Sequence, residues 1–168
     1  MTTIKDHCVL MARYGAWAYE RMFASLATLS DADYRADCGL FFRSLHGTLN
    51  HLLLADSVWF GRFTGQPFAA NSLAQEVEAD RAALVARVRA QGERWTGFVE
   101  AADPGLCDTR LVYRSMAGDA CDTPWAGTLL HVFNHGTHHR GQMSAALTRF
   151  GQPAPEMDFV YFLRLQGV

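Results

Sequence analysis

The sequence DTPWAGTLLHVFNHGTHHRGQMSAALTRFG, residues 122–151, decides how the chain folds. Apolar residues recur through it at intervals of three and four, which is the period of a helix with one buried face. Asp122 or Thr123 is placed to cap this helix, and Pro124 would occupy its first position. Gly151 is placed to end it. The stretch therefore predicts a helix of about seven turns that packs one face into a core.

Helical periodicity extends to most of the remaining chain. It predicts three further long helices, over residues 3–29, 40–63 and 72–101. Between 103 and 122 the helical period is lost, and β-forming residues on both sides of Gly118 predict a small hairpin before the fourth helix. The expected fold is all-α: a four-helix bundle that forms a single domain over residues 1–168.

Composition and charge exclude several classes of protein. The chain has 168 residues, 49% of them apolar, so it can bury a sizeable core and is not disordered. Its 15 Lys and Arg against 17 Asp and Glu, without a basic run, argue against nucleic acid as a partner. No long apolar stretch opens the chain, and its four cysteines form no CxxC pair. We therefore expect a cytoplasmic protein with reduced thiols and no membrane contact.

Histidines are concentrated on the fourth predicted helix, which carries His131, His135, His138 and His139. On a helical wheel His139 lies about 60° and His135 about 100° from the centre of the apolar face, whereas the other two point outward. The four-residue spacing of the inner pair lets both imidazoles reach one metal ion. The alternative is that these rings are solvated or hydrogen-bonded in the core, so a third ligand from elsewhere would decide between them.

Two histidines on the second predicted helix compete for the place of third ligand. His51 lies among small residues, which would leave room for an ion and a substrate. His46 lies towards the bulky apolar side of the same helix and lacks that clearance. We therefore favour His51, although a structural role for either ring remains the alternative.

A charged residue interrupts the apolar face of each of these two helices. Asp56 does so on the second helix and Arg140 on the fourth. We expect both to be buried structural groups, each compensated by an opposite charge or by hydrogen bonds, and we expect a pairing between them across the two helices. The alternative for Arg140 is that its long side chain reaches solvent.

The pattern of motifs resembles the DinB/YfiT-like family of metal-binding four-helix proteins. The likeness covers nearly the whole chain and rests on Tyr14 and Trp17 near the start, LHGTLNHLLLADSVWFGRFTG at 45–65 and HVFNHGTHHRGQ at 131–142. It places metal ligands on His51, His135 and His139, the set that the wheel favours. It also implies a divalent ion, nickel, zinc or iron, and a homodimer. Bulky residues on the second helix, including Phe41, Phe42, Trp59 and Phe60, favour a homodimer independently, with a monomer as the alternative.

Members of known activity in that family resemble thiol-cofactor-dependent transferases and isomerases, and others resemble hydrolases. The resemblance therefore implies a metal-dependent enzyme that acts on a small-molecule substrate, a transferase or a hydrolase, with a low-molecular-weight thiol as a second cofactor. A non-catalytic metal-binding bundle of the stress response is the alternative. No motif assigns a catalytic residue, and HHRG within the fourth helix is not a phosphate loop.

Overall fold

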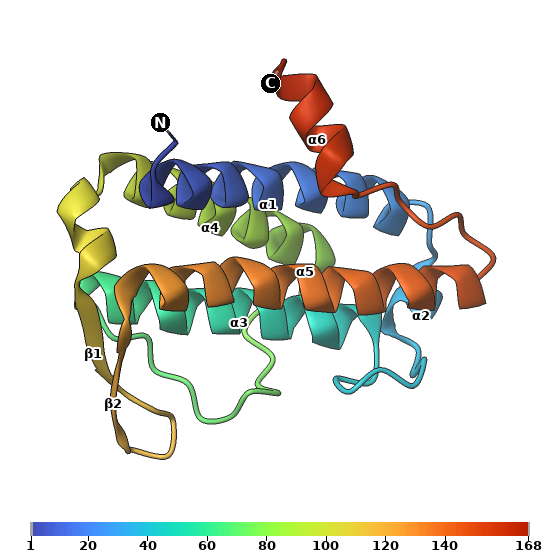
Figure 1. Ribbon diagram of the computed structural model, residues 1–168. Helices are drawn as coiled ribbons and strands as arrows, with labels where there is room; N and C mark the ends of the chain where they lie inside the picture. Colours follow the sequence, from blue (N-terminus) through green and yellow to red (C-terminus); the bar gives the residue numbers. More distant parts are fainter. Residues whose placement is uncertain (1, 168) are drawn as a thin grey trace.

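The computed structural model describes residues 2–167, and four long helices form a bundle in it (Figure 1). They are α1 (Ile4–Leu26), α3 (Leu45–Thr64), α4 (Arg81–Ala101) and α5 (Trp125–Arg149). Helix α1 packs on α4 and α5, and α3 packs on the same two helices from the other side. The predicted helical bundle is confirmed. Shorter helices are α2 (Asp31–Arg35), the 3-10 helix η1 (Pro104–Asp108) and α6 (Phe159–Gln166).

The first two long helices are shorter than predicted. Thr3 caps α1 through a reciprocal hydrogen-bonded pair with Asp6, and the helix ends at Leu26 rather than at residue 29. Helix α3 begins at Leu45 rather than at residue 40. Ser44 caps it with its side chain, and the turn before it is closed by Arg43 in the left-handed region, at φ 68°. A helix cannot pass through that backbone conformation, so the cap and not the apolar period sets the boundary.

The prediction that the third helix starts at residue 72 is wrong, because residues 65–80 form a loop and α4 begins only at Arg81. The physical reason is a contact with α3. The Asn50 side-chain oxygen accepts hydrogen bonds from the backbone N–H groups of Val77 and Glu78, at 2.8 and 2.9 Å. These bonds fix the loop against α3, and the Asp80 side chain then caps α4.

The predicted hairpin is present, and it feeds directly into α5. Strand β1 (Arg110–Arg114) pairs antiparallel with β2 (Ala120–Pro124). The predicted cap of α5 by Asp122 or Thr123 is wrong because both residues lie in β2. Pro124 instead occupies the N-cap position, without a side-chain cap bond, so the strand passes into the helix with no intervening loop.

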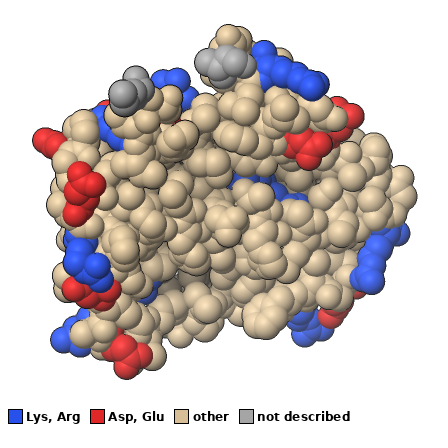
Figure 2. All heavy atoms as spheres, in the orientation of Figure 1, with Lys and Arg blue, Asp and Glu red and all other residues tan. Residues whose placement is uncertain are grey.

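Two groups of buried apolar side chains fill the bundle. One surrounds Met22, Leu49 and Met143, and the other surrounds Trp95 and Leu129. On the face drawn in Figure 2, charged groups of both signs lie mostly near the margin and uncharged residues cover most of the middle. The four cysteines, all within the described part of the chain, form no disulfide. Within residues 2–167 no helix has the length and apolarity needed to cross a membrane.

Candidate metal centre

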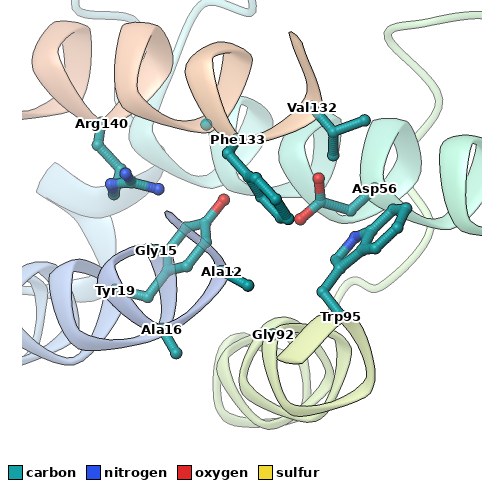
Figure 3. A pocket seen from close by; sticks show the side chains of 11 residues that line it. Ala12, Gly15, Ala16, Tyr19, Asp56, Gly92, Trp95, Val132, Phe133 and Arg140 are labelled. Atoms are coloured by element: carbon teal, nitrogen blue, oxygen red, sulfur yellow. The ribbon is translucent and has the colours of Figure 1, made fainter. Parts of the chain in front are cut away.

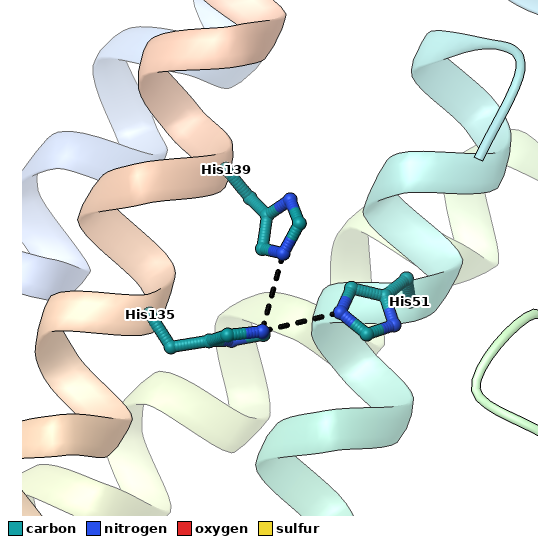
Figure 4. Close-up of side chains that lie close together, drawn as sticks. All are labelled: His51, His135 and His139. Carbon is teal, nitrogen blue, oxygen red and sulfur yellow. Dashed lines mark hydrogen bonds between the residues drawn. The ribbon is translucent and has the colours of Figure 1, made fainter. Parts of the chain in front are cut away.

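Three imidazoles from two neighbouring helices converge at the interface of α3 and α5 (Figure 4). His51 comes from α3, and His135 and His139 come from successive turns of α5. The Nε2 atom of His135 lies 3.2 Å from Nε2 of His51 and 3.1 Å from Nε2 of His139. The structure therefore brings together the three histidines that the sequence favoured, across 84 residues of chain.

The outer ring nitrogens fix which tautomer two of these histidines adopt. Nδ1 of His51 lies 2.9 Å from the carbonyl oxygen of Leu73, and Nδ1 of His139 lies 2.8 Å from Oε1 of Gln142. Both partners are acceptors, so each Nδ1 carries the proton and each Nε2 presents a lone pair. Both lone pairs face His135 Nε2, and one ring nitrogen cannot donate to both. The arrangement is typical of ligands that surround a cation.

The spacing of these nitrogens fits a single ion. Two imidazole nitrogens that bind one metal at 2.0–2.1 Å with tetrahedral angles lie about 3.3 Å apart. The two measured separations, 3.2 and 3.1 Å, agree with that value. All three ligand atoms lie within 4.8 Å of one another. The cluster could therefore hold a metal ion without a large rearrangement of the side chains.

The surroundings of the cluster keep the rings neutral. Burial lowers the pKa of His51 and of His139 below the usual value for histidine. For His135, burial together with repulsion from the neighbouring imidazoles lowers the pKa to about 3. Since only a neutral imidazole binds a metal, the cluster is in the binding-competent state at pH 7.

An aromatic ring covers one side of the cluster. The ring of Phe42 stacks on that of His51, with centroids 3.8 Å apart and planes within 15°. It also lies 5.7 Å from the His139 ring. The open space expected beside His51 is thus partly filled, by Phe42 and by the loop that carries Leu73. Leu73 had not been singled out in the sequence. Phe42 had been assigned to the second helix and to a dimer interface, whereas it lies in the turn before α3 and covers His51.

The other histidines lie outside the cluster. Nε2 of His46 is 3.1 Å from both the Glu76 carboxylate and the Asn50 amide, so His46 ties the loop to α3. His131 and His138 are exposed on α5, as the wheel predicted. His138 Nε2 lies 3.0 Å from the amide nitrogen of Gln142, so the same glutamine links an exposed imidazole to a buried one.

A small cavity lies between the four long helices (Figure 3). Its volume is about 20 Å³, room for one water molecule. Asp56 and Arg140 both line it and are buried, at 8% and 2% exposure, which confirms that part of the prediction. The two residues do not form the expected direct ion pair, because none of the ion pairs within residues 2–167 joins them. Arg140 instead donates to Thr137 and lies over the ring of Tyr19, 4.8 Å from its centroid.

The carboxyl group of Asp56 is strongly perturbed by this environment. Burial raises its pKa to about 7, and the positive charge of Arg140 opposes the rise only in part. In Figure 3 the Tyr19 hydroxyl points between the two charged groups. One fixed cation, Arg140, and one carboxyl group that titrates near neutral pH, Asp56, therefore line this cavity.

The fold and the site together define a helical-bundle protein with a buried three-histidine cluster that could hold a metal ion. The family model described as the DinB family matches residues 1–167, and the chain belongs to that family. A relative, named Protein DinB, comes from Bacillus subtilis (strain 168). It is 25% identical to this chain over 169 residues, and the match covers 95% of each protein.

Proposed function

We propose that this protein is a metal-dependent enzyme that acts on a small molecule, as a transferase or a hydrolase. The observation that carries the proposal is the convergence of His51, His135 and His139, two of them with Nε2 lone pairs fixed by partners on Nδ1. Three protein ligands leave at least one coordination position for a substrate or water, which is the pattern of catalytic sites. Nickel, zinc and iron are the candidate ions, because imidazole suits all three.

In this proposal three histidines bind the ion, and other residues of the chain orient their imidazole rings. The carbonyl of Leu73 and the side chain of Gln142 hold two rings in the productive tautomer, and Phe42 excludes water from one side of His51. When bound, a divalent ion supplies Lewis-acid chemistry, which makes water or a thiol more acidic. The participation of a low-molecular-weight thiol is supported by the resemblance of the sequence motifs to the DinB/YfiT-like family.

The burial of the ligands favours a second candidate function. His51 and His139 are only 4% and 7% exposed, and Phe42 lies flat against one of them. A structural ion is held in such a closed site, so the alternative is a non-catalytic metal-binding protein of the stress response.

Turnover by protein of defined metal content distinguishes the two functions. Purified protein is stripped and reloaded with zinc, nickel or iron(II), then assayed with p-nitrophenyl acetate, and with 1-chloro-2,4-dinitrobenzene together with a panel of cellular thiols. We expect turnover by the loaded wild type and by the His138→Ala variant, and none by His135→Ala or the stripped protein. If loading raises the melting temperature but no substrate is consumed, the binding-protein function is supported instead.

A further inference from the structure

A groove lies at the hairpin end of the molecule, away from the metal centre. The C-terminal part of α3, the start of the loop at 65–80 and strand β1 enclose it, and its volume is about 540 Å³. That is within the range of pockets that bind small molecules. Its walls are largely apolar, and they include Val58, Phe68, Val112 and Met116.

Arg62 is the most unusual residue of this groove. Its guanidinium carbon lies 4.3 Å from the centroid of the Trp59 ring and 4.7 Å from that of the Tyr113 ring. The two rings pack edge to face with centroids 5.2 Å apart, and the guanidinium lies against both of them. Among residues 2–167 no partner forms a hydrogen bond or an ion pair with Arg62, so its N–H donors remain available at the edge of the group.

The charge of the groove is uncompensated. Arg62 and Arg114 line it, and no aspartate or glutamate does. Arg114 donates to the carbonyl of Gly118 and has no carboxylate partner in the described residues. Other arginines of the protein do pair with acids, as Arg89 does with Glu20. Burial lowers the pKa of Arg62, and Tyr113 and Cys121 oppose the shift only in part, yet a guanidinium stays charged at neutral pH.

We propose that this groove binds a small molecule that has one or two carboxylate groups and an apolar body. A carboxylate matches the planar edge of the Arg62 guanidinium through two parallel hydrogen bonds. Arg114 adds a second positive charge at the same groove, and the apolar body of the ligand contacts Val58, Phe68 and Val112. A single guanidinium fork beside two aromatic rings suits a carboxylate better than a phosphate, which usually gathers several backbone N–H donors.

This site is separate from the imidazole cluster. Arg62 follows His51 by eleven residues on α3, which is close to three full turns, so the two lie on one face of the helix about 16 Å apart along its axis. A small carboxylate cannot contact both. The proposal goes beyond the metal-dependent function and does not depend on it.

The test uses the indole N–H resonance of Trp59 in the full-length, ¹⁵N-labelled protein. This resonance is one of four from tryptophan side chains, and its loss in a Trp59→Phe variant assigns it. Hexanoate and glutarate are titrated, with hexanamide as a neutral probe of the same length as hexanoate. We expect the two carboxylates to shift the resonance saturably and hexanamide to bind at least tenfold more weakly. Equal affinity for hexanoate and hexanamide, or tighter binding of inorganic phosphate, would overturn the proposal.

Variants locate the interaction. We expect Arg62→Gln to weaken hexanoate binding at least tenfold and Arg62→Lys to weaken it less. Arg13→Gln, an exposed change of the same kind on α1, should leave binding unchanged, and so should His135→Ala, which removes an imidazole of the cluster. Wild-type affinity in Arg62→Gln contradicts the proposal. If that variant does not fold, the Arg62→Lys variant and the comparison of hexanoate with hexanamide on the wild type still decide the matter.

Discussion

Gln142 and His139 are joined by a hydrogen bond of 2.8 Å between Oε1 and Nδ1, within a single turn of α5. This bond sets the direction of the Nε2 lone pair that faces the other two imidazoles. Partners of this kind typically change metal affinity by about 10–100-fold when they are removed. We therefore expect Gln142→Ala to weaken zinc binding by that factor in isothermal titration calorimetry, with little loss of helix content. Gln166→Ala, an exposed substitution on α6, is the control, and equal affinities of the two variants would contradict the role of Gln142.

Metal content should separate the five histidines near the centre into two groups. Alanine at His51, His135 or His139 removes a ligand and is expected to lower zinc affinity by more than the roughly 100-fold effect of an outer partner. Alanine at His131 or His138 should leave one equivalent of metal bound, because both side chains are exposed. Mass spectrometry of protein purified after loading gives the metal content. Full occupancy of His135→Ala would refute the ligand assignment.

The raised pKa of Asp56 makes stability depend on pH. The protonated carboxyl is favoured in the folded state, where the pKa is about 7, over the unfolded state, where it is near 3.8. Stability is therefore greatest below the unfolded pKa and falls as the pH rises towards the folded value. Asp56→Asn has no carboxyl group to ionise at this position and should not lose stability in this way. Its stability relative to wild type should improve by roughly 3 kcal/mol between pH 5 and pH 8. Urea unfolding of both proteins at both pH values measures this difference in stability. The contributions of the histidines are the same in both proteins and cancel. Asp33→Asn, a substitution at an exposed site, is the control.

Arg140 and Asp56 should be energetically coupled although they form no direct ion pair. The charge of Arg140 lowers the pKa of Asp56, so the two groups interact across the shared cavity. A double-mutant cycle with Asp56→Asn and Arg140→Met is expected to give a coupling above about 0.5 kcal/mol at pH 8.5. At pH 5 the carboxyl is neutral and the coupling should shrink. A coupling that does not change with pH would mean that the two residues interact through packing alone.

The expected homodimer remains a prediction, and we propose that Phe41 lies in its interface. Phe41 is 83% exposed, and its ring contacts that of Phe42. An exposed aromatic residue at such a position is favoured at protein interfaces. Light scattering at micromolar concentration should give a mass near twice 18.7 kDa, and Phe41→Asp should shift it towards the monomer. A wild-type mass of 18.7 kDa would exclude the dimer at that concentration.

The helical bundle could be predicted because apolar spacing reports directly on which helix face is buried. The helix boundaries could not, because they depend on bonds between distant residues. The start of α4 is the clearest case. Ser72 and Gln75 have a capping pattern, yet Asn50 binds the backbone of residues 77 and 78 and delays the helix to Arg81. The local sequence around residue 72 does not predict that contact with Asn50.

The candidate site was predictable to a similar extent. The positions of His135 and His139 follow from their spacing on one helix, and His51 was favoured by the small residues around it and by the resemblance of motifs. The role of Gln142 could have been predicted, because a residue three positions after His139 lies beside it on a helix. The roles of Phe42 and Leu73 could not be predicted, because loops carry both residues to the site and the path of a loop does not follow from periodicity.

The separation of 84 residues between His51 and His135 has a consequence for the biogenesis of the protein. Ribosomes synthesise a chain from its N-terminus, so His135 and His139 are made well after His51. Until α3 and α5 dock, the nascent polypeptide offers one of the three ligand imidazoles on α3 and the other two on α5, which makes it a much weaker chelator than the finished centre. Premature capture of a wrong ion during translation is thereby disfavoured, and selection of the metal is deferred until the protein has folded.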